Sequence, residues 1–241
     1  MSAPPPRTAV LIPWQGDCPY RIAAREWTLR QYAEHHPDWE VVIGSPADDS
    51  VWRKGEAVEA ALVQTDADLV VVADADCWAP GVGDLVQKLR GRKDIKWGMA
   101  HTLVIRFTEQ ASALILDGTA PEDLLLDTEM LVQSPYVGYE GGGVVAVKRE
   151  AYDTAPIDKR FEGFGQEDEA WALALRCTAG DPWRSPLPLW HLWHPPQQRA
   201  DRHWGSDLSR SLYEEYLDAY LAGRMPQYLN ETYVTRTSAS G

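Results

Sequence analysis

The sequence has few cysteines, no long apolar run and a deficit of positive charge, and each shortage excludes a class of protein. Its three cysteines lie far apart, at Cys18, Cys77 and Cys177, so we expect neither a zinc site nor a disulfide framework, and a reducing cytoplasm is the expected location. No run approaches the ~18 apolar residues of a membrane span, and the first residues lack the apolar core of a signal peptide. The net charge of −13 argues against general affinity for nucleic acid or anionic membrane.

What the sequence does contain is a composition typical of one folded α/β domain. Its 241 residues, 44% of them hydrophobic, suffice for a sizeable core, and no second domain boundary is visible. We expect the domain over residues 1–232, with a flexible leader at 1–6, and a flexible polar tail at 233–241. Eleven tryptophans indicate either a well-filled core, which we favour, or stacking platforms for a ring-shaped ligand.

The stretch from Leu69 to Pro80 combines a buried strand with two acidic residues. Its apolar run includes three consecutive valines, which is typical of a strand covered on both faces of a parallel sheet. Asp74 and Asp76, separated by Ala75, project to the same side just past this strand, where open α/β sheets bind ligands. The spacing suits a divalent metal. The alternative is a solvated acidic turn, because aspartate is common after strands.

The first half of the chain alternates strands with helices. The expected elements are, in order, a strand at 8–12, a helix from Tyr20 that Pro37 closes, a strand at 41–43, a helix at 54–64 and the strand at 69–73. Such alternation builds a mostly parallel sheet with right-handed crossovers, flanked by helices, and its strand ends gather a ligand site on one edge. The predicted fold class is therefore α/β.

The second half is less regular. The expected elements are a helix at 83–89, a basic turn at 90–96, a strand at 97–104, helical spacing over 107–133, a strand at 144–147, a short strand at 187–192 and a C-terminal helix capped by Ser206. The strand at 144–147 is preceded by a turn of three glycines, Gly141, Gly142 and Gly143. Such a turn allows the backbone to approach a ligand closely; the alternative is a plain turn with no ligand.

Two further stretches carry candidate chemistry. In the first, two glycines within 161–168 precede Glu167 and Asp168 at a helix start, where carboxylates also serve as partners of the helix dipole. In the second, His191 and His194 lie in an apolar segment that ends in two prolines. Two histidines there, in a chain that already offers paired carboxylates, make a metal ligand credible, although a lone histidine is usually structural.

Taken in order, these stretches resemble the GT-A glycosyltransferases. The shared features are the first strand, the Asp-x-Asp after an apolar strand, a glycine-rich strand, a Gly-x-Gly-x-Glu-Asp loop and a late histidine. The segment from Gly141 to Arg176 is particularly similar to the carboxyl-terminal part of galactosyltransferases and polypeptide N-acetylgalactosaminyltransferases. One departure is Ala-Pro-Ile-Asp-Lys-Arg in place of the family's Gly-Gly-Phe-Asp-Glu, so the acceptor side is not assigned by the resemblance.

The resemblance implies a single Rossmann-like GT-A domain and a metal-dependent transfer of a hexosyl or N-acetylhexosaminyl group from a nucleotide-sugar, with UDP favoured. Asp76 and His191 are then the expected ligands of Mn²⁺ or Mg²⁺, Asp74 contacts ribose or a metal-bound water, and His194 faces the diphosphate. The histidine assignment stays open between the two. Asp168 is the general base if the reaction inverts the anomeric centre, and Glu167 contacts donor or acceptor; retaining families share the same loop.

The remaining donor contacts that we expect follow the first strands and the glycine turn. They are Pro13 and Trp14, Asp48 or Asp49, Arg53 or Lys54, Ala75 within the Asp-x-Asp, and Gly142 with Gly143. The acceptor stays unknown, with a protein, glycan or small molecule favoured over nucleic acid because of the acidity of the chain. Two alternatives are a non-catalytic nucleotide-sugar-binding module of the same fold and a haloacid-dehalogenase-type phosphatase, which also has Asp-x-Asp after a strand.

Overall fold

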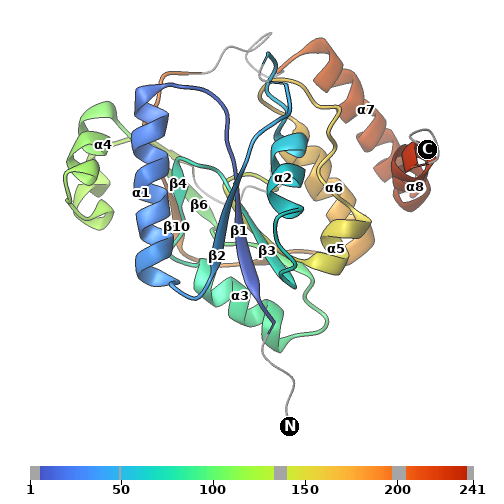
Figure 1. Ribbon diagram of the computed structural model, residues 1–241, viewed down its shortest axis with the longest axis horizontal. Helices are drawn as coiled ribbons and strands as arrows, with labels where there is room; N and C mark the ends of the chain where they lie inside the picture. Colours follow the sequence, from blue (N-terminus) through green and yellow to red (C-terminus); the bar gives the residue numbers. More distant parts are fainter. Residues whose placement is uncertain (1–5, 49, 133–139, 197–204, 238–241) are drawn as a thin grey trace.

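The computed structural model describes residues 6–48, 50–132, 140–196 and 205–237. A six-stranded sheet forms its centre (Figure 1). The strands are, in spatial order, β2 (Glu40–Gly44), β1 (Thr8–Pro13), β3 (Leu69–Ala73), β8 (Val144–Lys148), β5 (Trp97–Met99) and β9 (Trp183–Arg184). Only β8 runs against its neighbours β3 and β5, while the β2–β1, β1–β3 and β5–β9 pairs are parallel. The predicted α/β class with a mostly parallel sheet is confirmed.

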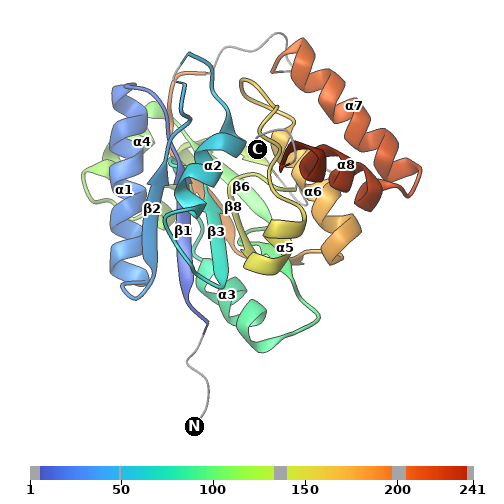
Figure 2. The ribbon, with the colours of Figure 1, turned by 45° about the vertical axis from the view of Figure 1, so that its right-hand side comes forward.

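Helices cover both faces of this sheet, as Figures 1 and 2 show. On one face lie α2 (Lys54–Leu62), α5 (Arg149–Thr154), α6 (Glu167–Ala179), α7 (Asp207–Leu221) and α8 (Met225–Thr237); on the other lie α1 (Pro19–His35), α3 (Val82–Gly91) and α4 (Glu109–Leu116). The strands supply both cores by alternation: Val70 and Val72 pack toward α2 and α6, whereas Val71 packs toward α1 and α3. Burial on both faces explains the continuous valine run.

A second, smaller sheet lies at the carboxyl ends of β1 and β3, the edge at which open α/β sheets bind ligands. Its order is β4 (Cys77–Trp78), β10 (Pro188–His191), β6 (Leu103–Phe107) and β7 (Thr128–Val132). Because β4 directly follows the Asp-x-Asp and pairs antiparallel with β10, the late histidines are brought to the end of β3. The small sheet therefore joins two parts of the site that lie over a hundred residues apart in sequence.

The structure corrects two expectations for the second half. The strand expected at 97–104 is two strands in different sheets, because the chain turns between β5 and β6 at the buried His101. The helical spacing over 107–133 gives only α4, followed by a 3₁₀ segment (Pro121–Asp127) and β7. At the C-terminal end, α8 runs through Thr237, and the domain bounds given above stay a prediction. The helix expected after Ser206 is confirmed, with the Ser206 hydroxyl accepting from Ser209 N at 3.0 Å.

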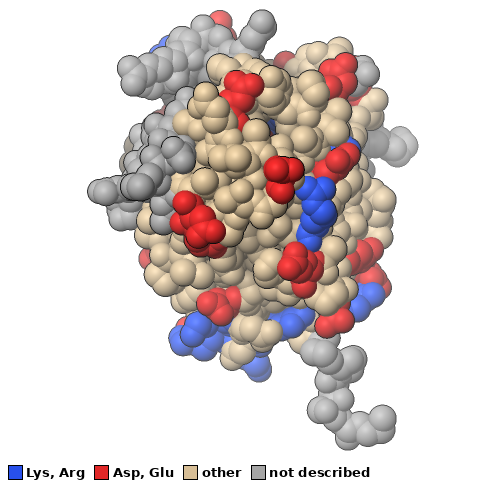
Figure 3. Space-filling view, turned by 90° about the vertical axis from the view of Figure 1, so that its left-hand side faces the viewer, with Lys and Arg blue, Asp and Glu red and all other residues tan. Residues whose placement is uncertain are grey.

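The surface agrees with the acidic composition. On the face shown in Figure 3, which is the α1 and α4 side, acidic side chains are scattered among uncharged ones and the basic side chains do not form a broad patch. Within the described ranges no helix has both the length and the apolarity that crossing a bilayer requires.

Candidate active site

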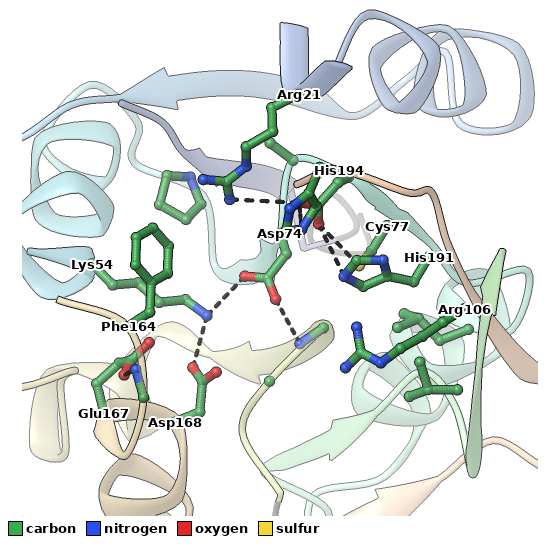
Figure 4. A pocket seen from close by; sticks show the side chains of 18 of the residues that line it. Arg21, Lys54, Asp74, Cys77, Arg106, Phe164, Glu167, Asp168, His191 and His194 are labelled. Atoms are coloured by element: carbon green, nitrogen blue, oxygen red, sulfur yellow. Dashed lines mark hydrogen bonds and ion pairs between the residues drawn. The ribbon is translucent and has the colours of Figure 1, made fainter. Parts of the chain in front are cut away.

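A cavity of about 670 Å³ opens at the carboxyl ends of β1 and β3, between the small sheet and the start of α6 (Figure 4). Most of the residues singled out in the sequence line it: Pro13, Lys54, Asp74, Ala75, Asp76, Gly142, Gly143, Glu167, Asp168, His191 and His194. The Asp-x-Asp is therefore part of a concave site rather than a solvated turn. Its position at the strand ends is the one that open α/β sheets use for ligands.

One pole of the cavity is an ion-pair network centred on Lys54, the first residue of α2. Its Nζ lies 2.8 Å from Asp74 Oδ1 and 2.7 Å from Asp168 Oδ1, so a single ammonium joins the end of β3 to the start of α6. The Lys54 side chain is only 5% exposed, against 32% for Asp74 and 26% for Asp168. The second Asp74 oxygen accepts from Gly143 N at 3.0 Å, and Asp74 N donates to Gly143 O at 2.8 Å. Asp74 is thus held from two sides.

Three carboxyl groups, those of Asp74, Glu167 and Asp168, lie near the Lys54 ammonium at this pole. Burial raises the pKa of the Asp168 carboxyl above its ordinary value; Glu167 and Asp74 add to the rise, and Lys54 opposes it. Burial likewise raises the pKa of Glu167, whose carboxylate accepts from Gly165 N at 2.9 Å. Burial lowers the pKa of Lys54, but the carboxylates of Asp168 and Asp74 outweigh it and raise that pKa well above its usual range. Asp168 is consequently a better proton acceptor than an exposed aspartate.

The other pole gathers Asp76, His191 and His194. One ligand atom from each lies within 4.8 Å of the others, and the Asp76 carboxylate is buried. Burial alone would raise the pKa of Asp76, but His191, Arg21 and His194 outweigh it and lower that pKa to about 2. A buried carboxylate facing imidazoles is a donor set that a divalent transition metal fits.

Local pairing explains how His191 reaches Asp76. In the β4–β10 register His191 lies opposite Cys77, the residue after Asp76, and Leu192 N donates to Asp76 O at 3.0 Å. The Cys77 thiol is buried beneath the carboxylate and donates to Asp76 Oδ1 at 3.4 Å. Of the two histidines, the structure brings both to Asp76 rather than His191 alone.

The glycine turn is required by close packing against the start of α6. Gly141 has φ +109°, and a Cβ there would lie 2.1 Å from Asp168 O. A Cβ on Gly142 would lie 2.9 Å from Asp168 Oδ2. The preceding Glu140 is buried, and its Oε1 accepts hydrogen bonds from Arg176 Nη2 at 2.7 Å and from Arg184 Nη2 at 2.6 Å. The turn therefore sets the position of Asp168 as well as that of Asp74.

The other expected nucleotide contacts do not line the cavity. Trp14 lies under the Arg25 guanidinium, 4.2 Å from the ring centroid. Asp48 binds the Ser50 backbone and hydroxyl, so it serves its own turn. Arg53 is not among the lining residues and binds Glu162, with Nη2 and Oε1 2.5 Å apart. Asp49 lies outside the described residues.

The sequence reasoning missed several residues that line the cavity: Arg21, Trp52, His101, Arg106 and Phe164. The rings of Trp52 and Phe164 stack with centroids 5.7 Å apart and an angle of 15°, and the Arg21 guanidinium lies 5.4 Å from the Phe164 centroid. The signal available for this pair was the surplus of tryptophan: Trp97 and Trp171 fill the core, as favoured, while Trp52 lines the cavity. Arg106 faces the cavity from β6, beside His191 in the strand register (Figure 4).

Comparison with known proteins gives a fold but no sequence family. No family model matches the chain, and no curated protein matches it. Among solved structures, glucosyl-3-phosphoglycerate synthase from Mycobacterium tuberculosis, in complex with Mn²⁺, UDP-glucose and phosphoglyceric acid, is 20% identical with a TM-score of 0.51, covering 91% of this chain and 80% of that one. The same synthase with phosphoglyceric acid is 18% identical with a TM-score of 0.49, covering 89% and 80%.

At this level of identity the likeness shows the fold alone. It supports the GT-A fold and does not support the more specific resemblance to galactosyltransferases and polypeptide N-acetylgalactosaminyltransferases. It also gives no support to the phosphatase alternative. The sheet order, the flanking helices and the site at the strand ends agree with this result, and the chain has the GT-A fold.

Proposed function

We propose that the protein is a metal-dependent glycosyltransferase that moves a hexosyl or N-acetylhexosaminyl group from a nucleotide-sugar, with UDP favoured, to an acceptor hydroxyl. The observation that carries this proposal is the two-pole cavity: a metal-type set around Asp76 at one end and the proton-accepting Asp168 at the other. The synthase with the higher TM-score is described in complex with Mn²⁺ and UDP-glucose, which supports a nucleotide-sugar as the donor class.

Asp76 and His191 are the residues that would hold Mn²⁺ or Mg²⁺. Once bound, the ion would neutralise the charge that develops on a diphosphate leaving group as the sugar departs. Arg21, whose Nη2 is 3.5 Å from Asp76 Oδ2, supplies a second positive charge at that pole. These residues bind the donor's charged end, and the rest of the cavity is left for sugar and acceptor.

Asp168 is the group we assign to the acceptor hydroxyl. Its carboxylate accepts the hydroxyl proton as the oxygen attacks, and its raised pKa favours that transfer near neutral pH. Lys54 holds Asp168 in place through the 2.7 Å contact and lowers the pKa of its carboxyl, which opposes the effect of burial. This role applies to an inverting reaction, and Glu167 then orients the loop by accepting from Gly165 N.

The test separates binding from transfer. We expect Asp168→Asn to bind UDP-glucose in the presence of Mn²⁺ within about threefold of the wild type, because Asn keeps the shape and the metal pole is untouched. Release of UDP from UDP-glucose, measured with a panel of sugars, glycerate derivatives and water as acceptors, should fall by at least about a hundredfold, the usual contribution of a general base. Asp153→Asn, the same change at an exposed α5 position, is the control. An active Asp168→Asn variant would remove Asp168 from this role.

A further inference from the structure

We propose that His194 is a third protein ligand of the metal, so that Asp76, His191 and His194 form a two-histidine, one-carboxylate set that binds Mn²⁺ in preference to Mg²⁺. This inference rests on the proposed function for the presence of a metal at this pole, and it goes further in assigning His194 and in choosing the ion. The alternative is that His194 faces the diphosphate instead.

The geometry places all three ligand atoms around one point. His194 Nε2 lies 3.3 Å from Asp76 Oδ2, and His191 Nε2 lies 3.9 Å from Asp76 Oδ1. A six-coordinate ion with bonds of about 2.1 Å separates neighbouring ligand atoms by about 3 Å. The two separations from Asp76 are therefore within about 1 Å of those that one shared ion requires, and all three ligand atoms lie within 4.8 Å of one another. His194 is nearer to this arrangement than His191.

The hydrogen bond on the other side of the His194 ring fixes which nitrogen carries the proton. His194 Nδ1 lies 2.8 Å from Pro195 O. A carbonyl oxygen can only accept, so Nδ1 is the donor and Nε2 of the neutral ring keeps its lone pair. That lone pair is on the nitrogen nearest Asp76, and a backbone carbonyl behind the ring is the usual support of a metal-bound histidine.

Burial favours a structured site over a chance approach of surface side chains. The side chains of His191 and His194 are 16% and 15% exposed, that of Asp76 is 5% exposed, and the two imidazole centroids are 5.3 Å apart. All three side chains also line the cavity, so an ion held by them would be accessible to a ligand bound there. The site is thus closed toward the protein and open toward the cavity.

The ligand types decide the choice of ion. Mg²⁺ prefers oxygen ligands and gives up its waters reluctantly, whereas imidazole nitrogen suits transition metals. One histidine replaces one of the oxygen ligands that Mg²⁺ prefers, and a second histidine replaces another. We therefore expect the two-histidine set to separate Mn²⁺ from Mg²⁺ more strongly than Asp76 with one histidine would.

The experiment measures metal binding on the full chain without donor or turnover, so a missing transferase activity leaves the result interpretable. Mn²⁺ titrated into metal-depleted protein loses its free electron paramagnetic resonance signal on binding, and Mg²⁺ is then added as competitor. We expect the wild type to bind Mn²⁺ at least about tenfold more tightly than Mg²⁺, and His194→Gln to lose at least about tenfold in Mn²⁺ affinity with a smaller loss for Mg²⁺. His35→Gln, at an exposed α1 histidine, should match the wild type.

A spectroscopic count of nitrogens distinguishes a ligand from a neighbour. Electron spin-echo modulation of bound Mn²⁺ should show two coordinated imidazoles in the wild type and one in each of His191→Gln and His194→Gln. If His194→Gln binds Mn²⁺ as the wild type does, or if the wild type shows one imidazole, His194 is not a ligand and the inference is overturned. Failure of the wild type to bind Mn²⁺, both alone and with UDP present, would overturn it together with the proposed metal dependence.

Discussion

Replacing Lys54 by methionine removes one positive charge from the centre of the site and changes the volume of the side chain little. Methionine keeps the length of the aliphatic stem, so the packing of α2 against the strands is preserved while the ammonium is lost. Asp74 and Asp168 then face each other without the cation that lies 2.8 Å and 2.7 Å from them. We expect Lys54→Met to destabilise the protein and to raise the pKa of Asp168 further, because Lys54 is the group that opposes the shift.

The magnitude follows from how much water reaches the pair. Removing one partner of a fully buried ion pair costs about 3–5 kcal/mol. Here the lysine is 5% exposed, but the carboxylates are 32% and 26% exposed and regain part of their hydration, so we expect a loss of about 2 kcal/mol in the free energy of unfolding at about pH 9. At pH 5 the loss should shrink. Burial raises the pKa of Asp168 to about 8 and Lys54 opposes that rise, so at pH 5 the carboxyl is protonated in both folded proteins; the extra cost in the variant develops as the pH rises through about 8, where the wild type ionises Asp168 more readily than the variant.

Urea unfolding followed by tryptophan fluorescence at about pH 5 and about pH 9 gives both numbers. Lys159→Met is the matched control, because Lys159 pairs with Glu59 at 2.6 Å on the surface, with side chains 39% and 51% exposed. We expect the control to lose less than about 1 kcal/mol at either pH. A Lys54→Met variant that is as stable as the control, or equally destabilised at both pH values, would refute the reasoning about this network.

Two other perturbations test the surroundings of the site. Gly141→Ala should lower the free energy of unfolding by at least about 2 kcal/mol and weaken donor binding, because φ is +109° and the new Cβ would lie 2.1 Å from Asp168 O. Urea unfolding measures the first effect and binding calorimetry the second, and near-wild-type values would contradict the packing argument. Burial lowers the pKa of His101 to about 4, so the free energy of unfolding that depends on its neutral ring is fully present above about pH 6.5 and is lost as the pH falls from about 6.5 to 4. His101→Gln should therefore reduce, by up to about 3 kcal/mol, the stability that the wild type loses across this pH window. Unfolding measured as a function of pH checks this, and identical profiles for the two proteins would contradict it.

Much of the fold follows from local sequence signals. The valine run of β3 is continuous because both faces of that strand are buried, and the Ser206 cap identifies the start of α7 directly. The region 97–133 was harder to predict, since β5 and β6 are adjacent in sequence but belong to different sheets. That division depends on pairing with β8 and β10, which are remote in sequence, and no local periodicity encodes it.

The site divides in the same way. Asp74, Asp76, Asp168 and His191 were found because acidic and imidazole side chains at strand or helix ends form a pattern in the sequence. The central position of Lys54 was not visible, because its two partners lie 20 and 114 residues away along the chain. Only the tertiary fold, which places the first residue of α2 beside the end of β3 and the start of α6, brings the three groups together.

The measurement that tests the central claim most directly is a thermal-unfolding panel of the wild type and Asp76→Ala with UDP-glucose, in Mn²⁺ or in a chelator. A ligand at about a hundred times its Kd adds about 2.7 kcal/mol, which corresponds to roughly 5–10 °C for a chain of this size. The account predicts a shift of that order for the wild type with Mn²⁺ and none with the chelator or in Asp76→Ala. An unchanged shift in Asp76→Ala, or no shift of the wild type with UDP-, GDP-, ADP- or CMP-sugars, would contradict a metal-dependent nucleotide-sugar site.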